Sequence, residues 1–273
     1  MENLNMFCIT MNSNHLSFIK EINYTPVGLG EEKFSKEWFS DNTGNHISKK
    51  NQFYGEYTFH YWIWKNYLDK LNEGWIGFCQ YRKFWSIENK NLLPDSLSQL
   101  KSLVLSKIPK TYENVDVILG EEYFIDQLKL MKFLKKGSKI ILKKPSYLFN
   151  KKKRNIKFHF DLMHGENTLD DAIDLLDKKN KEGFKIFVNT EVSFNPHIMV
   201  ICKSKNKLKS FYEVVFPWLE KCEKIFGFEK LVGYNKTRIY GFLAERFMSY
   251  WFQKNTKYTT LPVIVYDIRK DII

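Results

Sequence analysis

Two short polar segments carry side chains that could bind a phosphate group. The first is Asp41-Asn-Thr-Gly-Asn-His-Ile-Ser-Lys-Lys-Asn51, which stands directly before a stretch with helical periodicity. Ser48 is the expected N-cap, which places Lys49 and Lys50 in the first turn. Lysines there oppose the helix dipole, and a bound anion would remove that conflict. Solvated lysines that point away would account for the pattern equally well.

The second segment, Gln80-Tyr81-Arg82-Lys83, follows the apolar run 75–79. That run predicts a buried strand, and ligands of open α/β sheets collect beyond the carboxyl ends of strands. Arg82 could bind a diphosphate through two parallel hydrogen bonds. The alternative is that these are ordinary polar residues at a strand end.

Apolar runs predict the strands that would position both segments. They cover residues 4–9, 75–79, 115–119, 197–202 and 261–266, and a further extended piece ends at 24–28. Because helical periodicity separates several of these runs, the order of elements favours a parallel sheet with helices on its faces.

The predicted helices have recognisable ends. The first follows Ser48, ends at Gly74 as a C-cap and carries a core stripe made of Tyr54, Tyr57, Tyr61, Trp64, Leu68 and Leu71. A second helix is expected from Asp95, its N-cap, to Lys107, and a third begins at a capping box formed by Thr168 and Asp171. A fourth begins at Lys205 and is bent or broken at Pro217, and a fifth runs from Lys236 to Gln253.

Histidine and cysteine spacings do not indicate a metal or a disulfide. None of the six histidines forms an HxxxH or HExxH pattern, so scattered structural roles are expected for His15, His46, His60, His159, His164 and His197. The four cysteines, Cys8, Cys79, Cys202 and Cys222, have no CxxC spacing, and we expect a reducing compartment. Three of them sit inside apolar runs, where a reduced thiol packs as a small hydrophobe.

The bulk composition predicts a folded protein with an anionic partner. The 273 residues are 44% hydrophobic, and the formal net charge is +12. We expect one folded unit with two lobes, no signal peptide, and no run of apolar residues long enough to span a bilayer. Residues 132–157 are strongly basic, including Lys151-Lys-Lys-Arg154, and are expected to form an insertion.

Several spaced motifs together resemble one protein family. The first of these motifs is the segment 41–51. The others are Tyr54, Glu56 and Thr58; Tyr61-Trp62 with Trp64-Lys65-Asn66; and Ile76-Gly-Phe-Cys-Gln-Tyr-Arg-Lys-Phe84. The family pattern reads approximately D-x-T-G-x-N-I-S-x-K-N, Y-x-E-x-T, Y-W-x-W-K-N and I-G-L-x-H-Y-R-R-Y-F. The segments 112–119 and 238–246 continue the similarity over nearly the whole chain.

The resembled family was long catalogued as a domain of unknown function. It contains capsular and exopolysaccharide glycosyltransferases, including galactofuranosyltransferases. The chain departs from its pattern at four positions: His46 replaces Asn, Gln80 replaces His, and Lys83 and Phe84 replace Arg and Tyr.

The resemblance implies a GT-A-like fold, which is a Rossmann-related, mostly parallel sheet flanked by helices. It further implies a cytoplasmic bacterial enzyme that transfers a sugar from a UDP-sugar to a growing surface polysaccharide. Galactofuranose is the sugar that the resemblance favours. On this basis we expect a single domain with a nucleotide-sugar-binding half (1–125), a basic helical insertion (126–187) and an acceptor-side half (188–273). The residues expected to bind the nucleotide sugar are Asp41, Asn45, Ser48, Lys50, Asn51, Glu56, Gln80, Tyr81, Arg82, Lys83 and Arg238.

Most GT-A enzymes hold a divalent metal through a D-x-D after a buried strand, and no D-x-D follows residues 75–79. We therefore expect no metal or other cofactor, with Arg82, Lys83 and Lys50 supplying the positive charge instead. An inverting transfer also needs a carboxylate base. Glu245 is preferred among four candidates, the others being Glu191, Asp116 and Glu56; pairing with a nearby base is the alternative role for Glu245.

The acceptor is expected to be lipid-linked or an oligosaccharide. The basic run 151–154, with Phe149, Phe158 and Phe160 nearby, could contact an anionic membrane peripherally, or could be a solvated loop. A nucleic-acid-binding protein is the main rival interpretation, since basic and aromatic residues alternate on single-strand binding surfaces. Most aromatic residues fall on helical core stripes, which disfavours it. A non-catalytic scaffold of polysaccharide assembly is a third alternative.

Overall fold

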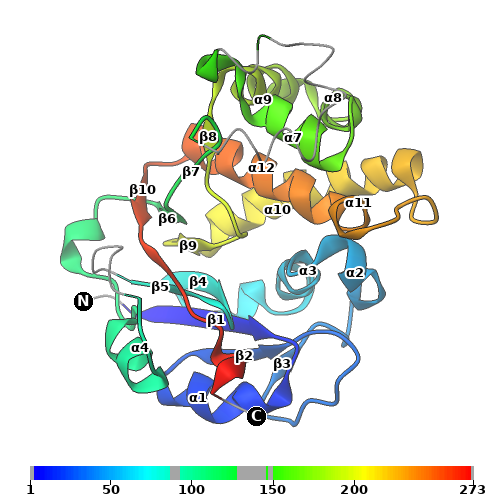
Figure 1. Ribbon diagram of the computed structural model, residues 1–273. Helices are drawn as coiled ribbons and strands as arrows, with labels where there is room; N and C mark the ends of the chain where they lie inside the picture. The colour runs from blue at the N-terminus through cyan, green and yellow to red at the C-terminus, as the bar shows by residue number, and fades with distance from the viewer. Residues whose placement is uncertain (1–2, 87–92, 128–145, 147–149, 272–273) are drawn as a thin grey trace. The chain divides into compact units, whose positions relative to one another are not determined.

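The computed structural model describes residues 3–86, 93–127, 146 and 150–271. The chain divides into two compact units. The sheet unit comprises Met1–Glu121, His197–Glu213 and Phe252–Ile273, and the helical unit comprises Glu122–Pro196 and Val214–Trp251. Two long helices, α10 (Lys205–Phe226) and α12 (Ile239–Asn255), contribute residues to both units (Figure 1).

The sheet unit is built on a sheet of nine described strands. Along its main path the order is β10-β6-β9-β4-β1-β2-β3, and β5 and β11 extend it from β4. The strands are β1 (Leu4–Thr10), β2 (Thr25–Gly28), β3 (Phe39–Ser40), β4 (Trp75–Gln80), β5 (Lys83–Trp85), β6 (Val117–Gly120), β9 (Val200–Cys202), β10 (Tyr258–Leu261) and β11 (Val263–Val265). Six of the seven strands on the main path share one direction, because β9 alone is antiparallel to both of its neighbours. The predicted α/β fold with a mostly parallel sheet is confirmed.

Continuous apolar strands arise because helices cover both faces of this sheet. In β1, Met6 and Cys8 join a core with α1 (Leu16–Glu21) and α4 (Leu97–Leu103). Phe7 points to the other face, where its ring centroid lies 5.6 Å from that of Phe59 on α3 (Tyr57–Asn66). Figure 1 shows α1 and α3 on opposite sides of β1.

The long helix predicted after Ser48 is interrupted. A 3-10 turn, Ser48–Lys50, leads into α2 (Asn51–Tyr54), and Gly55 at a φ of 58° separates α2 from α3. Ser48 lies inside the 3-10 turn and makes no capping bond, so the predicted N-cap is wrong. The C-cap is also wrong: α3 ends at Asn66, a 3-10 turn follows at Leu68–Lys70, and Gly74 directly precedes β4.

The core stripe of that region is partly confirmed. Tyr54, Tyr57, Leu68 and Leu71 are buried, whereas Tyr61 and Trp64 are only half-buried. The backbone turn at Gly55 rotates α3 relative to an uninterrupted helix, so the six residues do not share one face.

Two further boundaries differ from expectation. Helix α4 is capped by Ser96, whose hydroxyl accepts from the Gln99 amide, and Asp95 stands outside it. Strand β9 begins only at Val200, because His197 and Ile198 have φ values of 77° and 58° that extended backbone excludes.

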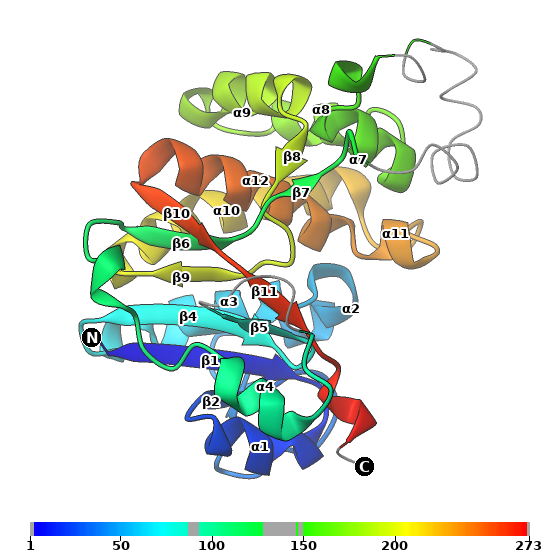
Figure 2. The ribbon, with the colours of Figure 1, turned by 60° about the vertical axis from the view of Figure 1, so that its left-hand side comes forward.

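The C-terminal strand is two strands. Pro262, which lacks an amide hydrogen, separates β10, parallel to β6, from β11, antiparallel to β5. Figure 2 shows β11 beside β5, near the C-terminal end of the chain. A 3-10 turn, Ile268–Lys270, follows, and two others lie at Ser13–His15 and Lys110–Tyr112.

The helical unit contains α7 (Ile156–His164), α8 (Thr168–Asp174), α9 (Lys178–Thr190), α11 (Tyr234–Thr237) and the short pair β7 (Tyr123–Phe124) and β8 (Ser193–Phe194). The predicted capping box is wrong, since Thr168 is already helical and Asn167 holds the N-cap position at a φ of 67° without a side-chain bond. Helix α10 continues through Pro217, and the predicted helix 236–253 is split between α11 and α12.

The basic stretch 132–157 lies mostly outside the described residues, which here include a 3-10 turn at Lys151–Lys153 and the start of α7. Among the described helices, none is long and apolar enough to cross a membrane. All four cysteines are free, and all four are buried, one more than the three that the apolar runs predicted.

Candidate functional site

Both polar segments follow strands that end at one edge of the sheet. Strands β1 to β4 are mutually parallel and end at Thr10, Gly28, Ser40 and Gln80; we call this the carboxyl edge. Asp41 comes directly after β3, and Tyr81 directly after β4. The fold therefore brings the two predicted segments to the edge at which sheets of this type bind ligands.

Tyr81 is the centre of a cationic cluster at this edge. The guanidinium carbons of Arg82 and Arg269 lie 5.0 and 5.2 Å from the Tyr81 ring centroid. The His15 ring lies 5.6 Å from it, centroid to centroid. Two guanidinium groups in reach of one aromatic ring could bind a doubly charged diphosphate.

The C-terminal segment is fixed on this cluster by backbone hydrogen bonds. The Tyr266 amide donates to the Arg82 carbonyl at 3.1 Å, and the Ile268 amide donates to the Tyr81 carbonyl at 3.4 Å. Asp267 accepts hydrogen bonds from Arg269, and chiefly for this reason its pKa is lowered. Sequence reasoning missed Arg269, because nothing in residues 267–270 indicates that they return to a turn near residue 82.

His15 is a second residue that sequence reasoning left in a structural role. It is fully buried, its Nδ1 lies 2.7 Å from the Thr10 hydroxyl, and its Nε2 has no partner. Burial lowers the pKa of His15, although Asp267 opposes the shift. A neutral imidazole therefore stands at the end of β1, with one ring nitrogen unsatisfied.

The segment after β3 is held by two side chains of α3. The Trp62 indole donates to the Thr43 carbonyl at 2.8 Å. The Asn66 side chain accepts from the Asn45 amide at 2.9 Å and donates to the Asn45 carbonyl at 2.8 Å. Gly44 allows this close approach, because a Cβ there would lie 2.3 Å from Asn66 Oδ1. The Y-W-x-W-K-N motif thus binds the D-x-T-G motif.

Several predicted site residues have structural contacts. Asn51 donates to the Gly55 carbonyl and to the Thr58 hydroxyl, both at 3.2 Å. Gln80 is buried, and its amide donates to the His197 carbonyl at 2.8 Å, which fixes the backbone just before β9. The Ser48 hydroxyl lies 2.9 Å from His46 Nδ1.

Other predicted residues take positions along the same elements. The ammonium of Lys50 lies 5.9 Å from the Tyr54 ring centroid. Glu56 occupies the N-cap position of α3. Lys83 begins β5, opposite Val265 of β11.

Asp41 is the most unusual of the predicted residues. It is fully buried, and neither carboxylate oxygen has a hydrogen-bond partner. The nearby Thr58 hydroxyl donates instead to the Gly55 carbonyl. Burial raises the pKa of Asp41, while Thr58 and His46 oppose the shift. A buried carboxylate without a partner is costly and is typical of a residue that a ligand completes.

Arg238 and Glu245 belong to the helical unit. The Arg238 guanidinium lies 5.7 Å from the Tyr234 ring centroid. Glu245 pairs with the adjacent Arg246, whose buried guanidinium stacks 4.3 Å from the Phe194 ring centroid. Its assignment as the base stays a prediction.

The other carboxylates differ in position. Asp116 precedes β6, at the opposite edge of the sheet, where its side chain accepts from the Lys257 amide at 2.9 Å. Glu191 is the exposed C-cap residue of α9.

The residues after β4 do not fit a divalent metal. The first two side chains after the strand are a tyrosine and a cationic arginine, neither of which provides the carboxylate or carbonyl oxygens that Mg²⁺ or Mn²⁺ prefers. Among residues 3–86, 93–127 and 150–271, no group of three or more His, Cys, Asp or Glu side chains is placed to hold a metal ion.

The fold and the carboxyl edge define an α/β protein of GT-A-like architecture. The chain belongs to the family described as "Domain of unknown function (DUF4422)", whose model matches residues 8–256. Arg269 lies outside the matched range.

A solved structure shares the fold across nearly the whole chain. It is described as "WbbM bifunctional glycosytransferase apo structure", with a TM-score of 0.69 and 19% sequence identity. The similarity covers 97% of this chain but only 45% of that chain, so this chain spans less than half of the solved protein. No protein with a curated function matches significantly.

Proposed function

We propose that this protein is a glycosyltransferase that uses a nucleotide diphosphate sugar. The observation that carries the proposal is the pair of guanidinium groups, Arg82 and Arg269, beside Tyr81 at the carboxyl edge. The GT-A-like fold and the structural similarity to a glycosyltransferase support it.

In the proposed reaction the acceptor hydroxyl oxygen attacks the anomeric carbon of the donor sugar. The bond from that carbon to the diphosphate oxygen breaks, the nucleoside diphosphate leaves, and the hydroxyl proton passes to a carboxylate. Arg82, with Lys83, Lys50 and Arg269, neutralises the charge on the leaving diphosphate without a metal. Glu245 is the proposed base for an inverting transfer.

The donor is proposed to be a UDP-sugar, with UDP-galactofuranose as the first choice. The acceptor would be a lipid-linked or oligosaccharide precursor of a bacterial capsular or other surface polysaccharide, at the cytoplasmic face of the membrane. The family pattern quoted above, with its galactofuranosyltransferase members, supports these choices.

A thermal-shift screen tests the proposal. The purified chain is heated with UDP, UDP-galactopyranose, UDP-galactofuranose, other nucleotide sugars and a short oligonucleotide, each with EDTA or manganese. One nucleotide sugar should stabilise the protein in EDTA, by about 2.7 kcal/mol at a hundredfold excess over Kd. Stabilisation by the oligonucleotide alone would overturn the assignment.

Arg82→Ala should lose most of that ligand-induced shift, because the diphosphate loses a bidentate partner. Lys101→Ala is the matched control, since Lys101 is a cation of the same unit that pairs with Glu21 at the end of α1. An Arg82→Ala protein with full donor affinity and turnover would remove Arg82 from the site.

Glu245→Gln should bind the donor normally but lower turnover roughly 100-fold or more, the usual contribution of a general base. Sugar transfer from the donor found in the screen measures this. Turnover near that of the parent protein would show that Glu245 serves only its ion pair with Arg246.

A further inference from the structure

The segment that joins α10 to α12 exposes apolar side chains. We call residues 225–238 the α10–α12 loop; it includes the last two residues of α10 and the short helix α11. In it Ile225, Val232 and Tyr234 are 58%, 78% and 66% exposed. Large apolar side chains gathered in one exposed segment are typical of a surface that contacts a partner.

The loop is held in this conformation by its own hydrogen bonds. The Thr237 hydroxyl donates to the Leu231 carbonyl at 2.9 Å, and the Tyr240 hydroxyl donates to the Gly227 carbonyl. A His164 ring nitrogen lies 2.8 Å from the Asn235 carbonyl oxygen. The apolar side chains are therefore exposed on a structured loop.

Two glycines shape the exposed turns. Gly227 and Gly233 have φ values of 60° and 83°, and a Cβ built at either would have no atom within 4 Å. The glycines are needed for the left-handed backbone and not for close packing. The turns therefore face open space.

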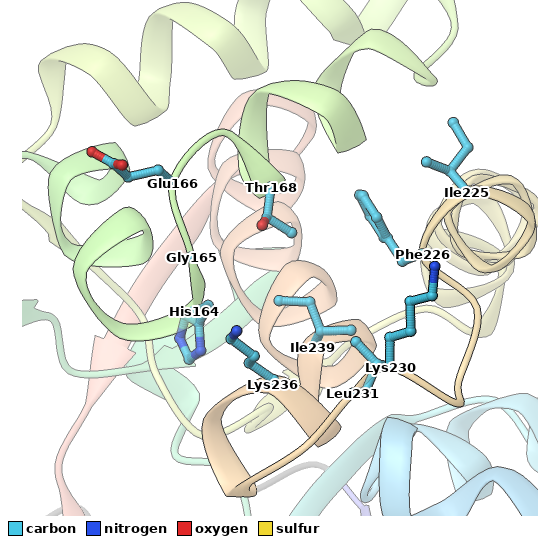
Figure 3. A pocket seen from close by; sticks show the side chains of 10 residues that line it. All are labelled: His164, Gly165, Glu166, Thr168, Ile225, Phe226, Lys230, Leu231, Lys236 and Ile239. Carbon is cyan, nitrogen blue, oxygen red and sulfur yellow. The ribbon is translucent and has the colours of Figure 1, made fainter.

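Beside the loop lies a pocket of ≈ 490 Å³ with mixed lining. Figure 3 shows Phe226, Leu231 and Ile239 there, together with the cationic side chains of Lys230 and Lys236. The lining therefore combines an apolar surface with two ammonium groups and one carboxylate, that of Glu166.

The charge of the loop is complementary to an anionic surface. Within residues 225–238 the cations are Lys230, Lys236 and Arg238, and the single anion is Glu229. Lysine is depleted at the cores of protein–protein interfaces, whereas basic residues beside aromatic and aliphatic ones are typical of segments that lie in a bilayer interface.

We propose that the α10–α12 loop docks the protein on an anionic lipid bilayer. Ile225, Val232 and Tyr234 enter the interfacial region, while Lys230 and Lys236 bind headgroup phosphates. This inference does not depend on sugar transfer, and it concerns residues other than the basic run 151–154.

Vesicle cosedimentation tests the proposal directly. The full chain should bind vesicles that contain phosphatidylglycerol and should bind phosphatidylcholine vesicles weakly. Val232→Ser/Tyr234→Ser should lower the partition coefficient roughly tenfold or more, and Lys230→Ala/Lys236→Ala should lower it roughly fivefold per lysine. Ile186→Ser is the matched control, because Ile186 is an exposed apolar residue of α9 in the same unit.

A site-specific label distinguishes docking from a general electrostatic attraction. The four native cysteines are buried, so Val232→Cys can be labelled selectively with an environment-sensitive fluorophore. Its emission should shift to the blue on addition of phosphatidylglycerol vesicles, whereas the same label on Ile186→Cys should not respond.

Three results would overturn the proposal. They are the absence of binding to phosphatidylglycerol vesicles, equal binding by the Val232→Ser/Tyr234→Ser protein, and equal emission shifts at both labelled positions. A concentration-dependent dimer that the same double substitution abolishes would assign the loop to a second copy of the chain instead. Light scattering after size-exclusion chromatography measures this.

Discussion

Asp41 and Gln80 show how differently two residues of similar polarity can be used at one sheet edge. The Gln80 side-chain nitrogen donates to the His197 carbonyl, which fixes the backbone just before β9. The Asp41 carboxylate is equally inaccessible to solvent but lacks any partner. Both carboxylate oxygens of Asp41 therefore keep unsatisfied hydrogen-bonding capacity in a buried position.

Asp41→Asn should stabilise the ligand-free protein at pH 7. Because burial raises the pKa of Asp41, ionisation is harder in the folded state than in the unfolded state. At a pH where Asp41 is protonated in both the folded and the unfolded state, this destabilisation is absent. It grows as the pH rises from 3.8, the pKa of an ordinary aspartate, towards the raised pKa of Asp41 in the folded protein. Removing the charge should add about 1–3 kcal/mol to the free energy of unfolding.

Thermal unfolding at pH 7 and pH 4 measures this effect, and the gain should shrink at the lower pH. Asp69→Asn is the control, since Asp69 is exposed and pairs with Lys209. A lower melting temperature for Asp41→Asn at pH 7 would contradict the prediction.

At the scale of elements, α3 organises the segment that follows β3. Its residues Trp62 and Asn66 bind the backbone at Thr43 and Asn45. Gly55 interrupts the helix before α3, and Asn51 donates to the Gly55 carbonyl at the break. The interrupted helix therefore supports the segment that contains Asp41.

Asn66→Ala should release this segment. The variant loses the bonds to the Asn45 amide and carbonyl and a third to the Trp62 carbonyl. The free energy of unfolding should fall by about 1–3 kcal/mol, and amide exchange at residues 43–46 should accelerate. Asn189→Ala, which removes one exposed bond to the Lys185 carbonyl, is the control. Unchanged exchange at residues 43–46 would show that Trp62 alone holds the segment.

At the scale of the whole molecule, the C-terminal segment returns to strand β5 and the turn after β4, which belong to the N-terminal third of the chain. Strand β11 pairs with β5, and the next turn carries Arg269 to Tyr81. These residues lie beyond the range matched by the family model. Arg269 therefore joins the proposed diphosphate site from outside the range that the family model matches.

Arg269→Ala should raise the donor Kd roughly tenfold or more, because hydrogen bonds between charged groups contribute about 1.5–3 kcal/mol. The melting temperature without ligand should change little, since the Arg269 side chain is 52% exposed and its ion pair with Asp267 is screened by solvent. Titration with the donor found in the thermal screen measures the affinity. Lys270→Ala, in the same turn, should bind as the parent does, and equal loss in both variants would indicate only a general charge effect.

Much of the sheet was predictable from sequence, because β1 and β4 are continuous apolar runs that only a two-sided core can bury. The polar segment after β4 was predictable for the same reason, since the end of such a run is a local feature. The segment 41–51 was recognised from the helical periodicity that follows it, whereas β3 before it was not predicted. Helix ends were less predictable. Ser48, Asp95 and Thr168 are all residue types that cap helices well, yet none of them occupies the N-cap position in the structure.

Sequence by itself determined the α/β class, the two polar segments and the four reduced cysteines, because each depends on residue type and short-range spacing. Only the tertiary structure decided that Gln80 supports His197, that Asn66 holds the segment 43–45, and that Arg269 joins Tyr81. These contacts join residues that are up to 188 positions apart along the chain. Their side chains meet because strand order and register place them together, and no local pattern encodes that proximity.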